Sequence, residues 1–406
     1  MMTKQIECEV LVVGGGVAGL CAAITAARAG AQTILIEKNN FPGGTAVIGL
    51  HRFICGLYLN GTQIPKATLN IGIVREIVAG LKMLAPAANL LKMGRVYVLP
   101  FATCDLVSVF RSLSENMPRL LLSYNTQAVS VEYDQGKIIS VTANDLLCKI
   151  NIKAGVIIDC SGDGAIIKMA GLQYRSATMA ERQLAGFAFR IKGIYPADEM
   201  ASIKVPYYLA KAAKAKKIPL HLKFTTFALT DDSGEGFCRL SIPPGLAAGL
   251  DAAGLDADRD RNLQAQANAR LVHSILKKKI PAFQNSCISK KNSSVVDREG
   301  IRLDGKFLLT AKDVLSGEKF FNGIVKNSWP IEFWDQNLGP YYKYLLPDDY
   351  YTIPSGCLKD KIIKNFLCAG RCISVTGEAL GSTRVMGTCM SLGEQAGRVA
   401  CKMTKR

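Results

Sequence analysis

The sequence has few aromatic and histidine residues and no closely spaced cysteine pairs. Aromatic residues make up 7% of its 406 positions, and three histidines are present. Thirteen cysteines occur, and Cys368 and Cys372 stand closest together. Because zinc ribbons and iron–sulfur clusters need tighter and repeated cysteine spacings, we expect no metal site. Free cysteines within apolar runs indicate a reducing compartment, so we expect a cytoplasmic protein.

A long uncharged run near the start lacks the features of a membrane segment. No residue from Val10 to Ala27 is charged, and this run is long enough to cross a bilayer. Three consecutive glycines interrupt it, however, and Glu7 and Glu9 precede it, whereas a signal peptide has basic flanks and a cleavage site of small residues. We therefore expect a buried strand, a turn and a helix here, and no membrane span in the chain.

Acidic residues are scarce relative to basic ones. The chain has 33 Asp and Glu against 50 Lys and Arg, a net charge of +17. This excess favours an anionic partner: a nucleotide cofactor, an acidic substrate, a nucleic acid or an anionic membrane surface. Part of the charge is clustered between Lys204 and Lys223, where a solvated helix face is the alternative interpretation. Nucleic-acid-binding proteins usually interleave aromatic with basic residues, and only Tyr207 and Tyr208 do so here, so nucleic acid is an open but disfavoured partner.

The N-terminal segment carries a β-α-β pattern. Ile6 to Val13 is a mostly apolar run ended by glycine, which is typical of a buried strand. Val17 to Ala29 predicts a helix whose small residues permit close contact with a sheet, and Gly30 ends it. Gln32 to Glu37 predicts the next strand, so the three elements form a β-α-β unit.

The glycines between the first strand and the helix fit a dinucleotide-binding turn. Gly14, Gly16 and Gly19 follow a G-x-G-x-x-G spacing: the first permits a tight turn, the second lets a pyrophosphate approach the backbone, and the third lets the helix pack closely. The amides at the helix start then face the phosphates. Glu37, at the end of the next strand, can accept hydrogen bonds from both hydroxyls of a ribose. The stretch predicts a site for the adenosine diphosphate half of a dinucleotide, which NAD and FAD share.

Two later regions complete the expected sheet. Leu121 to Cys160 contains short apolar runs separated by turn residues, which predicts a β-meander and a last strand. Phe366 to Ala369 predicts a short strand, and Thr388 to Lys402 predicts a helix with small residues on one face. The stretch between them, from Ser176 to about Asp348, has a basic, mixed α+β composition. We therefore expect the two ends to form one domain and the middle to be inserted.

One helix is expected within the inserted region. Four of its apolar residues recur every four positions: Leu263, Ala267, Leu271 and Ile275. This spacing predicts an amphipathic helix that stops before Pro281. The segment before it, residues 243–262, is rich in glycine and aspartate and predicts a loop.

Beyond Glu37 the sequence resembles a known flavoprotein family. "EKNNFPGGT" places Gly44 and Thr45 after the acid, "IDCSGDG" adds a second glycine turn, and "LCAGRC" begins a long block from Leu367 to Gly397. Together these motifs resemble the superfamily that includes succinate dehydrogenase and fumarate reductase flavoproteins, and most of all the group called FAD-dependent oxidoreductases. The resemblance implies FAD. It also implies non-covalent binding, because Gly44 or Thr45 stands where some relatives attach flavin through a histidine.

Pattern and resemblance together predict an α/β fold with a discontinuous, Rossmann-like FAD-binding domain that contains a β-meander. Residues 1–50, 100–175 and 350–406 would form this domain, and residues 51–99 and 176–349 an inserted α+β substrate or capping region. The resemblance assigns the following residues to FAD: Gly14, Gly16, Val17, Ala18, Gly19, Glu37, Lys38, Gly44, Thr45, Ala128, Ser161, Gly162, Asp163, Gly370, Arg371, Met386, Gly387 and Thr388. A helix that starts near Thr388 would direct its positive end at flavin N1 and O2, where charge accumulates on reduction.

Arg384 and Glu378 are the candidate catalytic residues. Arg384 stands just before the turn that would face the flavin, and an arginine there can orient an anionic substrate or stabilise developing negative charge. A structural ion pair between Arg384 and Glu378 is the alternative. His51 and His221 are weaker acid–base candidates, and Cys389 is more typical of a buried packing cysteine than of a reactive thiol.

The expected function is that of an FAD-dependent oxidoreductase. It would transfer a hydride between flavin N5 and a small organic substrate, with an unknown electron acceptor or donor. An anionic substrate fits the net charge.

Two departures from the family pattern lie on the substrate side: "REGIR" (298–302) replaces "RESRR", and Gly377 stands where a histidine is expected. "SWPIEFWD" (328–335) would line the substrate cavity or join the two domains. The alternatives are a flavin-dependent RNA-modifying enzyme that uses the basic surface, and a non-catalytic flavin-binding protein.

Overall fold

The computed structural model describes residues 3–195, 198–230, 234–245 and 252–405. Its largest sheet contains seven strands: β1 Thr3–Val13, β2 Thr33–Ile36, β6 Leu120–Ser123, β7 Gln127–Asp134, β8 Lys137–Asn144, β9 Lys149–Asp159 and β20 Phe366–Cys368. Their order is β6-β2-β1-β9-β8-β7, and β20 pairs with the C-terminal part of β9. The pairs among β6, β2, β1, β9 and β20 are parallel, whereas β8 pairs antiparallel with both β9 and β7.

The β-α-β unit and the β-meander predicted from the sequence are both confirmed. β1 leads through the glycine turn into α1 (Val17–Arg28) and then into β2. The uncharged stretch Val10–Val13 is buried at the centre of the sheet, where a parallel strand is covered on both faces. β7, β8 and β9 form the meander. The fold is therefore the mixed α/β architecture with a parallel sheet that the sequence predicts.

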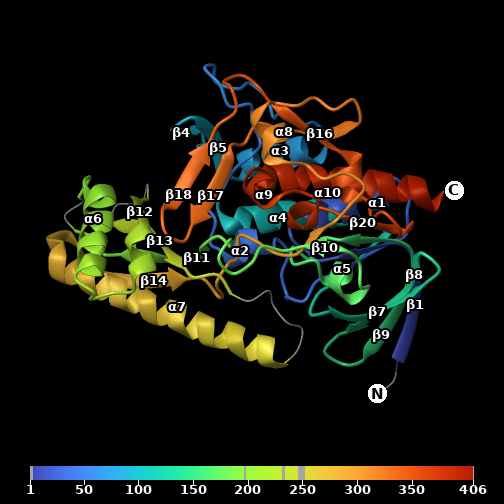
Figure 1. Ribbon diagram of the computed structural model, residues 1–406, viewed down its shortest axis with the longest axis horizontal. Helices are drawn as coiled ribbons and strands as arrows, with labels where there is room; N and C mark the ends of the chain where they lie inside the picture. Colours follow the sequence, from blue (N-terminus) through green and yellow to red (C-terminus); the bar gives the residue numbers. More distant parts are fainter. Residues whose placement is uncertain (1–2, 196–197, 231–233, 246–251, 406) are drawn as a thin grey trace.

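Helices from opposite ends of the chain pack side by side on this sheet. Figure 1 shows α1 next to α10 (Met386–Thr404), and the two helices share one hydrophobic core. Ala396 and Ala400 of α10 are buried, as their small size predicts. A Cβ at Gly393 would lie 2.0 Å from the carbonyl oxygen of Ala18, so only glycine permits this approach. The two ends of the chain thus belong to one unit.

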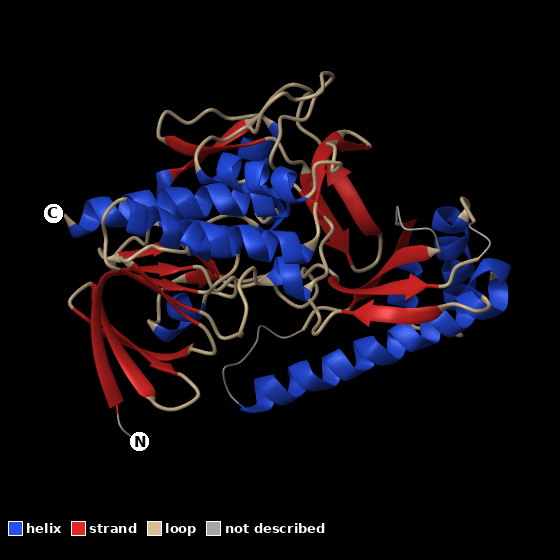
Figure 2. Cartoon of the chain, turned by 180° about the vertical axis from the view of Figure 1, so that it is seen from behind, coloured by secondary structure: helices blue, strands red, loops and turns tan. Residues whose placement is uncertain are grey.

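A second sheet lies to one side of this unit and has its own core (Figures 1 and 2). Its strands are β11 Ala185–Lys192, β12 Thr226–Leu229, β13 Glu235–Ile242 and β14 Cys287–Lys291, in the order β12-β13-β11-β14 and all antiparallel. Two helices, α6 (Ala201–Lys214) and α7 (Ala252–Lys279), contribute buried residues to the core of this sheet. We call this part the second unit.

The long helix α7 differs from its predicted form in two ways. It begins at Ala252, so residues 252–262 of the expected loop are helical, and residues 246–251 lie outside the described part. The apolar face is also not the predicted one. Leu263 and Leu271 are exposed, and the buried positions are Ala265, Ala269, Val272 and Leu276. A strict four-residue spacing drifts around a helix of 3.6 residues per turn, whereas the observed spacing of four, three and four stays on one face.

The division of the chain into two domains stays a prediction, but the hydrophobic contacts show how the segments are shared. Residues 51–99 and 301–349, which the sequence assigns to the capping region, place side chains such as Ile54, Ile77 and Ile331 in the core of the large sheet. The separate second core is built from residues 185–283.

The other helices of the described ranges are α2 Thr45–Ile48, α3 Ile73–Leu84, α4 Thr103–Ser114, α5 Ala165–Met169, α8 Ala311–Leu315, α9 Gly377–Thr383 and the 3-10 turns η1 Leu220–Phe224, η2 Pro281–Phe283, η3 Ser355–Leu358 and η4 Gly370–Cys372. The other strands are β3 Phe53–Ile54, β4 Leu91–Met93, β5 Val96–Pro100, β10 Tyr174–Arg175, β15 Arg302–Leu303, β16 Gly323–Asn327, β17 Ile331–Asp335, β18 Gly339–Lys343 and β19 Tyr351–Pro354. Among the described residues, no helix combines the length and the apolar character needed to cross a bilayer.

Candidate functional site

A cavity of about 1030 Å³ lies where the parallel strands of the large sheet end and the second unit begins. This volume is at the upper end of the range for small-molecule and cofactor sites. One part of the cavity lining is formed by the glycine turn with Glu37 and the loop 161–163, and we call it the glycine-turn end. Another part of the lining contains His51, Arg239, Arg298 and Arg384, and we call it the arginine end.

The glycine turn is shaped by contacts that leave no room for side chains. Gly14 has φ +107°, and a Cβ there would lie 2.5 Å from the carbonyl oxygen of Cys160. A Cβ at Gly19 would lie 1.8 Å from the carbonyl oxygen of Gly14. Gly16 differs, because a Cβ there would meet nothing within 4 Å. Packing therefore requires the first and third glycines, whereas the second borders open space in the cavity.

The start of α1 is suited to an anion. Its N-cap is Gly16, and no side chain caps the first turn or places a negative charge there. The first amides of a helix have no intrahelical acceptor, and they point toward whatever lies beyond the N-terminus. Val17 and Ala18 line the cavity at this point. The open space beside Gly16 is thus bordered by hydrogen-bond donors and by the positive end of the helix dipole.

Glu37 lines the cavity, and its carboxylate already has hydrogen-bond donors within the chain. Oε2 accepts from the amide of Gly15 at 2.5 Å, and Oε1 accepts from the amide and the side-chain nitrogen of Asn39 at 2.8 and 2.5 Å. An ionised carboxylate has about four acceptor positions, so these bonds leave about one free for a ribose hydroxyl. Asn39, which also lines the cavity, is a residue that sequence reasoning missed.

Asp159 stabilises the second glycine turn through side-chain hydrogen bonds. Its carboxylate accepts four hydrogen bonds, from the amides of Ser161, Ile166 and Ile167 and from the Ser161 hydroxyl. Burial raises the pKa of Asp159, while these hydrogen bonds act in the opposite direction. Because the bonds fix Ser161 at the cavity wall, Asp159 is a positioning residue. The sequence signal for it was present, since the aspartate directly follows the last apolar positions of β9.

Arg371 joins three loops at the wall of the cavity. Its Nε donates to the carbonyl of Gly162 at 2.7 Å, Nη2 pairs with Asp163 at 2.5 Å, and Nη1 donates to the carbonyl of Asp297. Burial opposes the charge of Arg371, but the carboxylate of Asp163 raises its pKa above the ordinary value. The arginine therefore anchors the wall around the cofactor rather than standing free to react.

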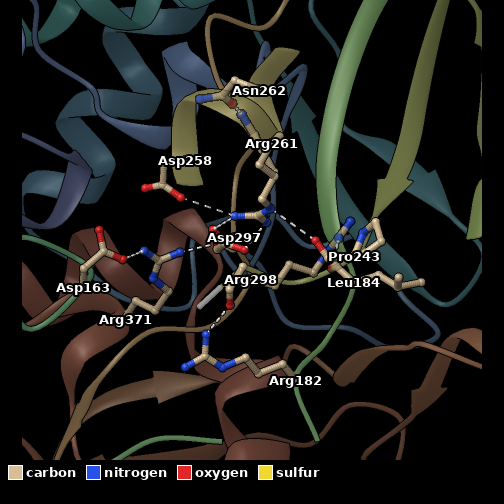
Figure 3. Close-up of polar contacts among 12 residues, drawn as sticks. Asp163, Arg182, Leu184, Pro243, Asp258, Arg261, Asn262, Asp297, Arg298 and Arg371 are labelled. Atoms are coloured by element: carbon tan, nitrogen blue, oxygen red, sulfur yellow. Dashed lines mark hydrogen bonds and ion pairs between the residues drawn. The ribbon is translucent and has the colours of Figure 1, made fainter. Parts of the chain in front are cut away.

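Helix α7 reaches the same wall from the second unit. Figure 3 shows Arg261 of α7 and Arg371 both contacting Asp297. Arg261 forms a bidentate pair with the Asp297 carboxylate, with N–O distances of 2.8 and 2.6 Å, and Asp258 lies 3.9 Å away. The segment that the sequence predicts as a loop thus supplies a charged helix turn to the cavity. Nothing in the sequence indicates the contacts of Asp297 with Arg261 and Arg371, because these residues lie far apart along the chain; Asp258 and Arg261 are only three residues apart.

Three guanidinium groups gather at the arginine end. Arg384 donates to the backbone carbonyls of Arg298 and Glu332 at 2.9 and 3.0 Å. Arg298 donates to the carbonyl of Leu184, and its guanidinium carbon lies 3.9 Å from the ring centre of Trp334. Burial, then the charges of Arg384 and Arg239, lower the pKa of Arg298. The carboxylate of Glu332 also lines this end and acts against these positive charges.

Arg239 is the arginine of this group that has the fewest partners. It comes from β13 of the second unit, and its guanidinium lies 5.8 Å from the ring centre of Phe237. Within the described residues it forms no hydrogen bond and no ion pair. Trp329, on the same cavity, has a buried Nε1 that also lacks a hydrogen-bond partner within the described residues. Because Arg239 is half-buried on the cavity wall, its guanidinium is available to an anionic ligand.

His51 is half-buried beside these arginines. Burial, followed by the charges of Arg239 and Arg298, lowers its pKa from 6.5 to about 3. The imidazole is therefore uncharged at neutral pH. His221, the other histidine considered from the sequence, lies in η1 and does not line the cavity.

The structure places Glu378 away from the cavity. Its carboxylate pairs with Nζ of Lys343 at 2.8 Å on the surface, where both side chains are nearly half exposed. Arg384 binds backbone carbonyls instead, so the alternative ion pair between Arg384 and Glu378 is not formed in the described structure. Glu378 follows the N-cap of α9 and points outward. A spacing of six residues gives no information about which face of a short helix and loop each side chain takes.

The other predicted residues divide into two groups. Most lie on the cavity wall: Gly14, Gly16, Val17, Ala18, Glu37, Lys38, Gly44, Thr45, Ser161, Gly162, Asp163, Gly370, Arg371, Arg384 and Met386. Four lie behind the wall: Gly19, Ala128, Gly387 and Thr388. The helix expected near Thr388 begins at Met386, and the amide of Gly387 donates to the carbonyl of Cys55 at 2.9 Å.

The tryptophan-rich segment 328–335 both lines the cavity and joins elements. Trp329 and Glu332 line the cavity, whereas the backbone of Trp334 bonds to residues 183 and 184.

The residues of this cavity fit a dinucleotide flavin cofactor. The glycine turn provides a concave backbone surface with helix amides, and Gly16 leaves open space beside them. A model of the FAD dependent oxidoreductase family matches residues 9–406. The chain belongs to this family. Its members are FAD-dependent enzymes, and the family match covers both ends of the cavity.

Matches to individual proteins are more limited. A 39-residue stretch is 53% identical to sarcosine oxidase subunit alpha of Rhizobium meliloti (strain 1021), and it covers 10% of this chain and 4% of that protein. A 170-residue stretch is 25% identical to thiamine thiazole synthase of Aeropyrum pernix, and it covers 41% of this chain and 58% of that protein. This chain therefore spans less than two thirds of each of these relatives.

Two solved structures, a flavin-dependent brominase and a reductase-like protein, align with most of the chain. Flavin-dependent brominase Bmp2 aligns with 98% of this chain and 80% of its own, at a TM-score of 0.49 and 13% identity. A geranylgeranyl bacteriochlorophyll reductase-like protein from Thermoplasma acidophilum aligns with 98% of this chain and 79% of its own, at a TM-score of 0.48 and 12% identity.

Proposed function

We propose that this FAD-dependent oxidoreductase transfers a hydride between a small organic anion and the flavin, with FAD bound non-covalently. The observation that carries the proposal is a single cavity with a dinucleotide-type glycine turn at one end and three arginines at the other. FAD, when bound, supplies the hydride acceptor or donor at N5. We also propose that the family belongs to the broader superfamily that includes succinate dehydrogenase and fumarate reductase flavoproteins, which the sequence resembles.

The glycine-turn end would hold the adenosine diphosphate. The amides of Val17 and Ala18 face the open space beside Gly16, where a diphosphate would be stabilised. Glu37 would accept a ribose hydroxyl at its remaining acceptor position, and Asn39 would orient the carboxylate. Arg371 and Asp163 would keep the adjoining loop in place.

The arginine end would bind and orient the substrate. A guanidinium presents five donors in a planar fork that matches a carboxylate, and Arg239 has none of them committed within the described residues. Arg298 and Arg384 hold their positions through carbonyl acceptors and add positive charge. Phe53, Val98 and Tyr342 supply apolar surface on the same cavity, which excludes water and strengthens the interaction between charges.

His51 is the side chain we propose for holding or moving a proton. Unlike the arginines around it, His51 is uncharged, because burial and the charges of Arg239 and Arg298 disfavour its protonated form. A substrate carboxylate bound by those arginines would offset their charge and raise the pKa of His51. Binding of the anion would thereby prepare the imidazole to accept a proton at a ring nitrogen. An uncharged substrate analogue would leave it unable to do so.

Reduction of the purified protein tests this proposal. The protein should be yellow, and acid denaturation should release the flavin, as expected for non-covalent binding. Stopped-flow reduction with a panel of small hydroxy and amino acids should bleach the flavin band with at least one member, whereas the matching primary amides should not. A protein that carries flavin but is reduced equally by acids and amides would contradict the role of the arginine end.

A further inference from the structure

The outward face of α6 is apolar where a solvated helix would be polar. Met200, Ile203 and Tyr207 are 50%, 61% and 58% exposed and follow one another at helical spacing. Together with Lys211 and Lys214 they fall within roughly a third of the helix circumference. The opposite side of α6 packs into the second core through Ala201, Val205, Leu209, Ala212 and Ala213. The apolar stripe is therefore the part of the helix farthest from the protein interior.

Lysines surround the C-terminal end of this stripe. A hollow of about 580 Å³ is lined by residues 213–220, among them Lys214, Lys216 and Lys217. Leu220, at its rim, is 63% exposed. Within the described residues, none of these three lysines forms an ion pair or a hydrogen bond through its side chain. Positive charge and exposed apolar surface thus occur next to each other on one face.

The charge of this segment is of one sign. Residues 200–223 contain six lysines and no acidic residue. Asp198, just before α6, is paired with Lys204 at 2.8 Å, and the neighbouring Glu199 is exposed and forms no ion pair with these lysines within the described residues. Figure 1 shows α6 at the outer edge of the second unit, on the side away from the large sheet. This surface is consequently open to a large flat partner and does not approach the cavity.

We propose that α6 and the adjoining hollow bind the surface of an anionic phospholipid bilayer. Ile203, Tyr207 and Leu220 would enter the boundary between headgroups and acyl chains, and the lysines of the hollow would contact phosphate groups. Each lysine near an anionic surface adds to the attraction, and the apolar residues add burial that salt does not screen. Single-stranded RNA would instead call for several aromatic side chains among the basic residues, and the exposed stripe offers Tyr207 alone.

Vesicle flotation tests the proposal directly. The full chain should float with vesicles that contain phosphatidylglycerol and phosphatidylcholine in equal parts, and should not float with phosphatidylcholine alone. Changing Lys214, Lys216 and Lys217 together to Glu should weaken binding roughly 100-fold or more, given the attraction per lysine at such a surface. Ile203→Asp should weaken it by roughly tenfold while every lysine is kept.

Matched controls lie at the opposite end of the molecule, in the meander. Leu147 is 87% exposed between β8 and β9, and Lys137, Lys149 and Lys153 are exposed on those strands. Leu147→Asp and the triple change of these lysines to Glu repeat the same chemistry there and should leave flotation unchanged. Flavin absorbance and the melting temperature of each variant show that the fold is intact. The result does not depend on the proposed substrate or on turnover.

Several outcomes would overturn the proposal. These are no flotation with either vesicle, equal flotation with both, or equal losses in the meander controls. Binding to single-stranded RNA that is abolished by the lysine changes and unaffected by Ile203→Asp would assign the surface to nucleic acid instead. Flotation that requires both the lysines and Ile203 would support the proposal.

Discussion

The two ends of the cavity differ in how their polar groups are paired. At the glycine-turn end, Glu37 accepts from Gly15 and Asn39, and Arg371 is committed to the surrounding loops. At the arginine end, the half-buried guanidinium of Arg239 forms no hydrogen bond and no ion pair within the described residues. Groups that are satisfied within the chain hold their own geometry, whereas a charged group without a partner in the chain can take one from a ligand. The first end is preformed by the chain, and the second is completed by what it binds.

The ends also differ in how the chain builds them. At the glycine-turn end, the glycine turn, α1 and Glu37 come from one stretch of sequence, and the loop 161–163 and Arg371 join them from later segments. The arginine end combines the loop at His51, β13 of the second unit, the loop at Arg298 and the junction of α9 and α10. Substitutions at the glycine-turn end should therefore affect cofactor and stability, whereas substitutions at the arginine end should affect substrate and leave the cofactor in place.

Two glycines of the same turn provide the largest contrast. Gly19→Ala would place a Cβ 1.8 Å from the carbonyl oxygen of Gly14, so we expect the free energy of unfolding to fall by about 3 kcal/mol or more. Gly16→Ala meets nothing within 4 Å and should leave that free energy unchanged while FAD affinity falls roughly tenfold or more. Denaturant unfolding and flavin titration measure the two quantities. Equal effects of the two substitutions on both quantities would contradict the account.

Arg239→Gln should separate substrate binding from cofactor binding. Removing the uncommitted guanidinium should lower kcat/KM for an anionic substrate by roughly 100-fold, because a charge-assisted bidentate contact contributes about 3 kcal/mol. Flavin content should stay at the wild-type level. Arg371→Gln is the matched change at the other end and should lower flavin content instead, since Arg371 supports the loop at Gly162 and Asp163. A loss of flavin in Arg239→Gln would break the comparison.

His51 should make the arginine end sensitive to acid. Its pKa is about 3 in the folded chain and about 6.5 when unfolded, so below pH 6.5 the unfolded chain binds a proton that the folded chain does not. The stability that the neutral imidazole contributes is thus lost as the pH falls from 6.5 toward 3. Between pH 6.5 and 5 this amounts to about 2 kcal/mol. Unfolding measured at both pH values should show a smaller loss for His51→Gln, and equal losses would contradict the half-buried, uncharged histidine.

The smallest effect is expected at Glu378. Its ion pair with Lys343 is exposed, and such pairs contribute about 1 kcal/mol or less. Glu378→Gln should therefore change neither kcat/KM nor flavin content, and should shift stability only slightly. A large loss of activity in this variant would return Glu378 to the catalytic residues that the sequence suggested.

Local patterns explain which features could be predicted from the sequence. The β-α-β unit, the meander and the C-terminal helix follow from apolar runs and glycines that act over a few neighbouring residues. Glu37 could be placed because it ends the strand that follows α1. These are features in which each position's role depends on its neighbours along the chain.

The arginine end could not be predicted in the same way. Arg239 acts on His51 because β13 of the second unit packs against Leu50, next to His51, and no local pattern encodes this contact. The four-residue spacing of Leu263 and Leu271 predicts the wrong buried face of α7, because small alanines pack inside instead. Asn39 orients Glu37, and Asp159 holds the second glycine turn, through side-chain hydrogen bonds. Many other polar residues near glycines make no such bonds, so the sequence alone does not single these two out.

Comparing FAD with FMN is the most direct measurement of the central claim, that the glycine turn and Glu37 hold the adenosine diphosphate half of the cofactor. FMN carries the same flavin ring without that half. Titration of flavin-free protein should show FAD binding roughly 100-fold or more tighter than FMN, and Gly16→Ala should remove most of that difference. If FMN binds as tightly as FAD, or if Gly16→Ala keeps the full difference, the account of the glycine turn is wrong.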